Sequence, residues 1–418
     1  MRGRDRCGTL ACGFGVIKPP LTTTSQRPLK ICDLTQFYSP VSGGVRRYIE
    51  QKSAFVRKIR PDCQHVVIIP GETTGMTGDT HSRIYSIASQ LLSRTSRYRA
   101  LTKLHLIEEV LEKERPDIIE SGDPYQVAWK AVASGRGLDI PVVGFYHSHF
   151  PEAYFRTISK FFGPLAVSIT DEIFRKYVVT LYNHFQCTFV PSPVLAKLLG
   201  SWGVEKIHTV DLGVDDRIFS PEPDDRFQTR RRLGIPLDAR LLVYVGRLAQ
   251  EKNVRTLFDA YQLIHWRHPG KYQLLCVGDG TQRAALTDLR NQTDTVHWMP
   301  YCDNSQELAA IYRAADLFVH PGVQETFGLV ALESQASGTP VVGIKGSYMD
   351  RIIFTDQKQW AGQNSPEALA DAIDAKFTQD LRQSGLRASE EARSRYSWDT
   401  VFTRLFEIYS EAINTFNP

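Results

Sequence analysis

The chain has 418 residues, of which 42% are hydrophobic, and this is enough for two domains with separate cores. The net charge of +4 is too small to argue for nucleic-acid binding, and no apolar run approaches the ~20 residues that span a bilayer. The seven cysteines form no CxxC pair or Cys/His cluster, so neither a zinc site nor a disulfide framework is predicted, and a reducing, cytoplasmic location fits best.

Residues 30–213 contain a series of short apolar segments that alternate with helical patterns. The preceding residues 1–29 are rich in Gly, Pro and Thr and are expected to be a disordered or mis-started tail. Short apolar strands alternating with helices are typical of a parallel sheet covered on both faces. Strands are expected at Lys30–Thr35, His65–Pro70, Asp117–Ser121, Pro141–His147, Cys187–Pro191 and Lys206–Gly213, and helices at Leu101–Glu114 and Ile169–His184.

A second series of the same kind occupies residues 239–396. Residues 214–238, between the two series, carry prolines and mixed charges that indicate a linker. Residues 397–418 are expected to form a closing helix with one apolar face. Strands of the second series are expected at Leu241–Gly246, Tyr272–Gly278, Thr295–Pro300, Asp316–Pro321 and Thr339–Ile344. The predicted fold class is α/β, with two doubly wound, Rossmann-like domains facing each other across a cleft at the carboxyl ends of their sheets.

Two cations follow the first strand of the second series. Gly246 allows a close turn at the strand end, Arg247 follows it, and Lys252 precedes a helix expected to open near Asn253. A guanidinium, an ammonium group and the positive end of a helix dipole together suit a diphosphate. The alternative is a pair of solvated surface cations.

Two carboxylates between Asp316 and Val342 complement these cations. Glu325 is expected in a turn after a strand, and Glu333 in the helix that follows. Residues 326–329 are expected to form the N-terminus of that helix, which is a second place for an anion. Carboxylate oxygens accept hydrogen bonds from sugar hydroxyls. The alternative is a helix-capping carboxylate followed by an exposed helix glutamate.

The first domain offers two features that would face these residues. Gly43 and Gly44 lie in a loop between a strand and a helix, where glycines allow the backbone to approach a phosphate or simply make a tight turn. His147 lies at the carboxyl end of a strand, where it can hydrogen-bond a sugar hydroxyl or transfer a proton. The alternative for His147, and for His149 two residues on, is a structural histidine.

Together these motifs resemble the retaining glycosyltransferases of family 4, which have the GT-B fold. The resemblance covers most of the chain after about residue 30. It is most specific from Leu241 to Val342, where GRLxxEKN, the GDG at Gly278–Gly280 and the two spaced glutamates occur in order. The first domain matches more loosely, through SGGV at 42–45 and the strand-end histidine.

The resemblance implies a role for each candidate residue. Arg247 and Lys252, next to Gly246, would bind the diphosphate of a nucleotide-sugar donor, Glu325 would contact the donor sugar, and Glu333 would hold the ribose hydroxyls. Backbone amides of Phe327, Gly328, Leu329 and Val330 would hold phosphate oxygens, Met299 would lie by the base, Gly43 and Gly44 would close on the diphosphate, and His147 would sit beside the reacting sugar. Such enzymes need no metal and no cofactor besides the donor, which agrees with the missing Asp-x-Asp motif.

The predicted activity is transfer of a sugar from GDP-mannose or a UDP-sugar to an acceptor hydroxyl with retained anomeric configuration, as in glycan or glycolipid biosynthesis. The acceptor is a sugar, a lipid or a small molecule, and no nucleic acid is expected. The basic stretch at Arg94, Arg97, Arg99 and Lys103 provides either peripheral contact with the inner face of a membrane or a solvated helix face. Two other functions stay open: a sugar-nucleotide epimerase or phosphorylase of the same fold, and a non-catalytic protein that binds a nucleotide sugar.

Overall fold

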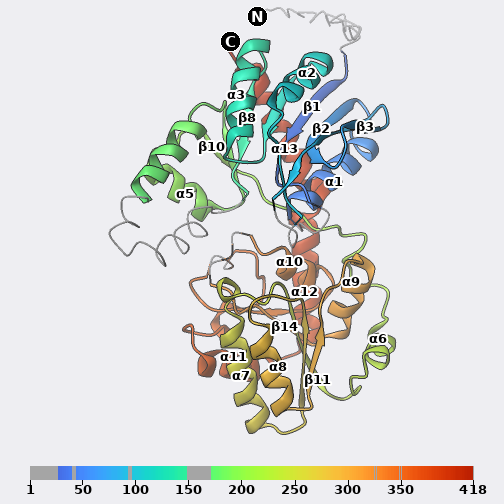
Figure 1. Ribbon diagram of the computed structural model, residues 1–418. Coiled ribbons are helices and arrows are strands. Elements are labelled where there is room, and N and C mark those ends of the chain that lie inside the picture. The colour runs from blue at the N-terminus through green and yellow to red at the C-terminus, as the bar shows by residue number, and fades with distance from the viewer. Residues whose placement is uncertain are drawn as a thin grey trace, which may run out of the picture.

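The structure, a computed structural model, describes residues 27–39, 44–92, 97–147, 171–323, 325, 327–347, 349 and 351–417. These residues form two α/β regions, one above the other in Figure 1, each built on its own sheet of mainly parallel strands. The fold class predicted from the sequence is therefore confirmed. Of the predicted tail, only 27–29 are among the described residues.

The N-terminal sheet has eight strands in the order β10-β9-β8-β7-β1-β2-β4-β3. They are β1 (Leu29–Leu34), β2 (Cys63–Gly71), β3 (Gly75–Gly78), β4 (Ser82–Ala88), β7 (Ile118–Ser121), β8 (Val142–Phe145), β9 (Thr188–Val190) and β10 (Ile207–Thr209). The helices around them are α1 (Gly44–Lys58), α2 (Leu104–Glu114), α3 (Gln126–Leu138), α5 (Pro193–Trp202) and a helix at 171–182. The order in which the strands are added reverses between β1 and β7, so the topological switch point lies between these two strands.

Two antiparallel pairings interrupt the predicted alternation of strand and helix. Strand β3 pairs antiparallel with β4, and β5 (Gln90–Leu91) pairs with β6 (Arg99–Ala100) as a separate ribbon. Arg99 thus lies in a strand, where it forms an ion pair with Glu72. The interpretation of this basic stretch as a helix face is wrong, because strands of two residues are too short to show a periodic pattern. Arg94 lies outside the described residues.

The C-terminal sheet is entirely parallel, with the order β13-β12-β11-β14-β15. Its strands are β11 (Arg240–Val245), β12 (Tyr272–Val277), β13 (Val296–Met299), β14 (Leu317–Val319) and β15 (Val341–Val342). The helices are η1 (Gln250–Lys252), α7 (Val254–Arg267), α8 (Arg283–Gln292), α9 (Ser305–Ala314), α10 (Leu329–Ala336), η2 (Gln357–Gln359), α11 (Pro366–Lys376) and α12 (Leu381–Tyr396). Here the switch point lies between β11 and β14.

The stretch predicted as a linker contains a helix, α6 (Arg226–Leu233). Its Arg230 is fully buried and donates hydrogen bonds to the carbonyls of Ala314, Leu237 and Ala239 and to the carboxylate of Asp316. Charge-assisted hydrogen bonds, rather than an apolar stripe, therefore fix this helix to the C-terminal sheet. Prolines and mixed charges in residues 214–238 predict a linker, and RFQTRRRL itself has no apolar periodicity that would indicate a helix.

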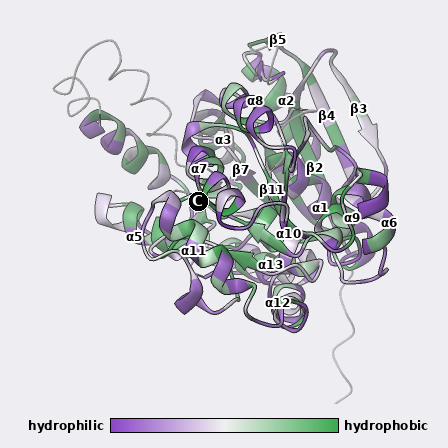
Figure 2. Cartoon of the chain, turned by 90° about the horizontal axis from the view of Figure 1, so that it is seen from below, coloured by the Kyte–Doolittle hydropathy of each residue, from purple (hydrophilic) through white to green (hydrophobic). Residues whose placement is uncertain are grey.

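The last helix, α13 (Trp398–Asn414), follows the C-terminal region but belongs to the core of the N-terminal one. Its Phe402 and Phe406 pack against Phe55 of α1, with ring centroids 5.6 and 5.2 Å apart. In Figure 2, hydrophobic segments of α10 and α13 lie near the middle of the molecule, whereas hydrophilic segments gather at its periphery. Helix α13 therefore connects the two regions, because it follows the C-terminal region along the chain and buries its apolar face in the N-terminal one.

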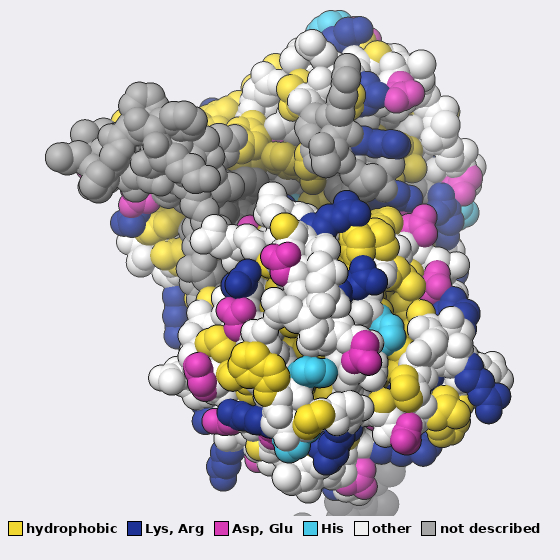
Figure 3. All heavy atoms as spheres, turned by 60° about the horizontal axis from the view of Figure 1, so that its bottom comes forward, with side chains coloured by type: hydrophobic (Ala, Val, Ile, Leu, Met, Phe, Trp, Pro, Cys, Tyr) yellow, Lys and Arg dark blue, Asp and Glu magenta, His cyan; other side chains and the backbone are white. Residues whose placement is uncertain are grey.

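The outer surface carries both signs of charge. On the face drawn in Figure 3, Lys and Arg side chains are interspersed with Asp and Glu side chains, as expected for a net charge of only +4. Among the described residues, no helix combines the length and the hydropathy needed to cross a membrane.

A buried polar cluster lies where α1, α13 and the first sheet meet. Lys52 of α1 is fully buried, and its ammonium group contacts Asp33 at 2.8 Å, Glu120 at 3.2 Å and the hydroxyl of Tyr409 at 2.8 Å. His65 contacts the other oxygen of Asp33 at 3.0 Å. Burial by itself would raise the pKa of Asp33, but the charge of Lys52 and the contact with His65 bring it down to about 2. The cluster is thus held together by one lysine charge between two carboxylates.

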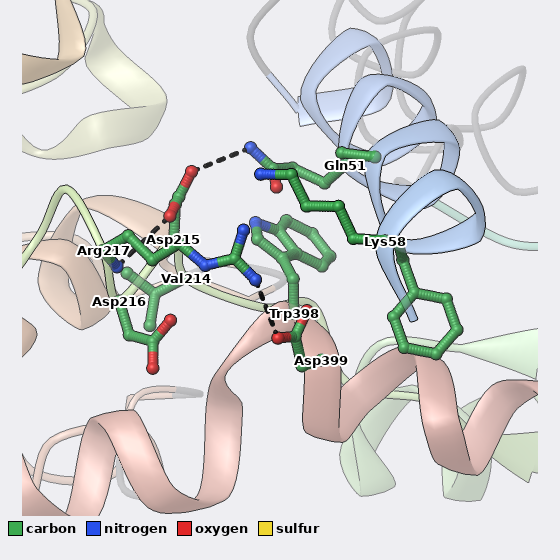
Figure 4. A pocket seen from close by; sticks show the side chains of 10 residues that line it. Gln51, Lys58, Val214, Asp215, Asp216, Arg217, Trp398 and Asp399 are labelled. Atoms are coloured by element: carbon green, nitrogen blue, oxygen red, sulfur yellow. Dashed lines mark hydrogen bonds and ion pairs between the residues drawn. The ribbon is translucent and has the colours of Figure 1, made fainter. Parts of the chain in front are cut away.

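The chain crosses between the two regions at two places that lie side by side. Val214 donates a backbone hydrogen bond to Tyr396 at 2.7 Å and accepts one from Trp398 at 3.2 Å. Figure 4 shows this hinge, where Gln51 of α1 donates to Asp215 at 3.2 Å and Arg217 pairs with Asp399 at 3.0 Å. The two crossings and helix α1 therefore form one unit.

Lys52→Met is expected to lower the free energy of unfolding by about 3–5 kcal/mol, because it leaves two buried carboxylates without their cation. Lys58→Met, at the exposed end of the same helix, serves as the matched control and should change it by less than about 0.5 kcal/mol. Urea unfolding followed by circular dichroism measures both. Equal stability of the two variants would contradict the role given to Lys52.

Candidate active site

The carboxyl ends of the two sheets face each other. Arg47, in the first turn of α1 after β1, contacts Glu333 of α10, which follows β14. On the C-terminal side, Arg351 follows β15 and contacts Asp211 and the carbonyl of Pro191, which follow β10 and β9. Both contacts join strand-end segments of one sheet to those of the other. The candidate residues from the two regions therefore meet at one junction.

Glycines bring the backbone turns after β11 and β12 into close contact. Gly246 and Gly278 have φ angles of +153° and +137°. A Cβ atom on Gly278 would lie 2.0 Å from the carbonyl oxygen of Gly246, so only glycine fits there. The Gly278 amide also donates to the carbonyl of Met299 at 2.8 Å, which places the end of β13 beside these turns. Gly246 and Met299, both predicted site residues, thus line neighbouring turns.

Lys252 and Glu325 form an ion pair at the switch point of the C-terminal sheet. Lys252 ends η1, and Asn253 follows it in the left-handed conformation with φ +55°. The Asn253 side chain donates to the carbonyl of Pro321 at 2.8 Å, which fixes the turn after β11 against the turn after β14. A predicted diphosphate cation and a predicted sugar-binding carboxylate are therefore in direct contact, with side chains 30% and 16% exposed.

Arg247 is directed to solvent. Its guanidinium is 66% exposed and pairs with Glu251 of the same turn at 3.0 Å. The carbonyl of Arg247 accepts a hydrogen bond from the hydroxyl of Tyr244 at 3.0 Å, so its backbone is anchored while its side chain is accessible. An anchored backbone with an exposed guanidinium leaves this cation available to a ligand.

Helix α10 begins at the place predicted for an anion site. Gly328 precedes it with φ +85°, and Phe327 is buried against Tyr396. Leu329 and Val330 form the first turn and are half-buried. The first amides of an α-helix have no partner within the helix and carry its positive dipole end. The predicted phosphate-binding amides of these four residues thus belong to a helix N-terminus next to Glu325.

Glu333 is 1% exposed, so it is not the exposed helix glutamate of the alternative interpretation. One carboxylate oxygen accepts from Arg47 of the other region, and the second accepts from the hydroxyl of Tyr312 at 3.3 Å. Burial lowers the pKa of Arg47, while the hydroxyls of Tyr312 and Tyr301 and the carboxylates of Glu50 and Asp215 oppose that shift. The predicted ribose-binding carboxylate therefore has a partner across the junction.

His147 lies at the switch point of the N-terminal sheet. Its ring stacks on Phe145 at 3.9 Å and meets the edge of Tyr48 at 5.3 Å. Burial, and then the positive charge of Lys52, lowers the pKa of His147 to about 3. It closes a small cavity lined by Asp33, Leu34, Thr35, Val45, Tyr48, Ile49, Glu120 and Gly122. A histidine with this pKa is neutral at physiological pH, and its ring nitrogens can donate and accept one hydrogen bond each.

The predicted glycine pair is only partly described. Gly44 begins α1, and a Cβ atom there would meet nothing within 4 Å, so its face is open. Gly43 and His149 lie outside the described residues.

The comparisons with known proteins agree with this geometry. A family model described as "Glycosyl transferases group 1" matches residues 225–395, and one described as "Glycosyltransferase Family 4" matches residues 42–218. The chain belongs to the group 1 glycosyltransferases. Its predicted resemblance is thereby confirmed.

Two relatives and one solved structure show how this glycosyltransferase compares with others. It is 27% identical over 405 residues to the GDP-mannose-dependent alpha-mannosyltransferase of Corynebacterium glutamicum, covering 93% of this chain and 90% of the relative. It is 35% identical over 233 residues to the D-inositol 3-phosphate glycosyltransferase of Thermobispora bispora, which spans about half of each chain (50% and 51%). The structure of Anabaena HepE in complex with UDP and glucose superposes with a TM-score of 0.68 at 17% identity, covering 92% of this chain and 100% of that one. This likeness places the glycosyltransferase in the GT-B fold.

Sequence patterns missed four residues of the glycosyltransferase that contact the candidate site. Arg47 and Tyr312 hold Glu333, Asn253 holds the turn at Lys252, and His320 lies buried at the end of β14. Burial lowers the pKa of His320 to about 4, although Glu325 opposes that shift. Only Arg47 had a signal in the sequence, since it follows the glycine pair by three positions. The others act through partners that are distant along the chain.

The neutral His147 should make stability depend on pH. Below about pH 6.5 the unfolded chain binds a proton at this residue, whereas the folded protein, with a pKa of about 3, does not. Stability therefore falls as pH falls from about 6.5. Between pH 7 and pH 5, the free energy of unfolding should fall by up to about 2 kcal/mol less in His147→Gln than in the wild type, as measured by urea unfolding. An identical pH dependence of the two proteins would contradict the lowered pKa.

Proposed function

We propose that this glycosyltransferase transfers a sugar from a nucleotide diphosphate donor to an acceptor hydroxyl with retained anomeric configuration and without a metal ion. The observation that carries the proposal is the contact of Lys252 with Glu325 at the switch point, beside the N-terminus of α10. The cation suits the diphosphate, and the carboxylate suits the hydroxyls of the sugar attached to it. In open α/β sheets, ligands bind outside the carboxyl ends of the strands at such a point.

In the proposed reaction, bond breaking places negative charge on the departing diphosphate. Lys252, the exposed Arg247 and the first amides of α10 would stabilise that charge, since each is a preorganised donor at the junction. The acceptor oxygen would attack on the face from which the diphosphate leaves and pass its proton to a phosphate oxygen of the leaving group. His147, neutral and half-buried in the facing region, would hold a hydroxyl of the reacting sugar.

The donor is proposed to be GDP-mannose or a UDP-sugar. The similarity over 93% of this chain to a mannosyltransferase named for GDP-mannose supports GDP-mannose. The likeness in fold to HepE, solved with UDP and glucose, supports a UDP-sugar. In either donor, a ribose and a diphosphate separate base from sugar. Glu333 and Lys252, on the helix after β14 and the turn after β11, offer a partner for each of these two groups.

Lys252→Ala is expected to lower turnover by about 10²–10³-fold or more, because it removes one donor to the departing diphosphate. The matched control is Arg255→Ala, an exposed cation of α7 that pairs with Asp259, and it should retain wild-type turnover. The assay measures nucleoside diphosphate released from GDP-mannose and UDP-glucose with a panel of sugar, lipid and inositol phosphate acceptors. Near-normal turnover of folded Lys252→Ala would contradict the assignment.

The same assay separates the other candidate functions. Conversion of the donor without any acceptor would indicate an epimerase, and donor binding without turnover would indicate a binding protein. Product analysis by proton NMR should show the donor's anomeric configuration, and chelation of metals with EDTA should leave the rate unchanged. An inverted product or loss of activity with EDTA would overturn the retaining or the metal-independent part of the proposal.

A further inference from the structure

Each oxygen of the carboxylate expected to hold the donor ribose already accepts one hydrogen bond. Arg47 donates to Oε1 of Glu333, and the Tyr312 hydroxyl donates to Oε2 at 3.3 Å. Tyr312 is fully buried and comes from the same sheet region as Glu333. Arg47 comes from the other region, and its side chain is 32% exposed. Of the two partners, Arg47 is the one that a ligand entering the junction can reach.

Helix α1 connects this contact to the hinge. Arg47 and Gln51 are one helical turn apart and therefore lie on the same side of α1. Gln51 contacts Asp215 where the chain crosses between the two regions (Figure 4). Lys52 fixes the helix to the N-terminal core. Helix α1 is therefore anchored at Gln51 and Lys52, and the contact of Arg47 with Glu333 depends on how the two regions are placed.

We propose that Arg47 competes with the nucleotide ribose for Glu333 and so sets the donor affinity of the enzyme. The inference rests on the proposed function, because it takes Glu333 as the group that binds ribose. A vicinal diol needs carboxylate oxygens as acceptors. Glu333 is 1% exposed with the Arg47 guanidinium on its Oε1, so the guanidinium has to leave before a diol can reach this carboxylate.

This competition has a measurable consequence. The apparent affinity of a ligand falls in proportion to the fraction of protein in which its site is free. Since the Arg47 side chain is partly exposed and can be displaced, we expect the pair to lower nucleotide affinity about threefold to tenfold. A ligand without ribose escapes the effect, since it has no group that needs Glu333.

The test compares Arg47→Gln with the wild type by titration calorimetry, using GDP, UDP and inorganic pyrophosphate as ligands. Arg47→Gln is expected to bind GDP or UDP about threefold to tenfold more tightly than the wild type, while its affinity for pyrophosphate stays unchanged. The matched control is Arg46→Gln. Arg46 neighbours Arg47 on α1 and pairs with Glu50 at 2.7 Å, and removing it should leave all three affinities unchanged.

Each outcome decides one question. Weaker or equal nucleotide binding by folded Arg47→Gln would overturn the competition, since Arg47 would then be a donor ligand or a bystander. Equal tightening for pyrophosphate would overturn it as well, because the effect would come from opening the junction rather than from Glu333. If the wild type binds pyrophosphate but neither nucleotide, or binds none of the three, the proposed function itself fails.

Discussion

The ammonium group of Lys52, buried between Asp33, Glu120 and the Tyr409 hydroxyl, determines where helix α1 lies. Removing a charge from water is costly unless it is paired, so this helix has one stable position against the sheet and α13. The position of α1 also fixes where the other residues of this helix lie. Arg47 contacts Glu333 of the opposite region, and Gln51 contacts Asp215 at the hinge. One buried lysine therefore helps to fix the contacts that α1 makes with the C-terminal region.

The protein uses its cations in two distinct ways. Lys52 and Arg230 are fully buried, and each is surrounded by carboxylates, hydroxyls or carbonyls that satisfy it. Arg247 and Lys252 are 66% and 30% exposed, and each has a single carboxylate partner among the ion pairs of the described residues. A buried and saturated cation can only support the fold, whereas an accessible one can exchange its partner for a ligand. The proposed diphosphate site belongs to the second kind.

Among the described residues, the two regions are joined by ion pairs and by a hydrophobic cluster that includes residues of both cores. The Arg47–Glu333 and Arg351–Asp211 pairs link opposite strand ends, and the hinge is formed by two adjacent chain crossings. The Arg47–Glu333 ion pair takes one partner from each region, which is what the proposed competition with a nucleotide for Glu333 requires.

The sequence alone determined most strands of both sheets, the closing helix and the residues at the strand ends, because these depend on local periodicity and on glycines near each turn. It did not predict β3, β4 or the short strands β5 and β6, and it predicted a linker where α6 lies, because ion pairs rather than an apolar face anchor that helix. For the site, residues 246–252 and 325–333 were predicted together because strand order brings them to one edge of one sheet. Only the tertiary structure decided that Lys252 pairs with Glu325. The same holds for the contact of Arg47 with Glu333, which lies 286 positions further along the chain. Such contacts depend on how two independently folded sheets pack, and no local pattern along the chain encodes that packing.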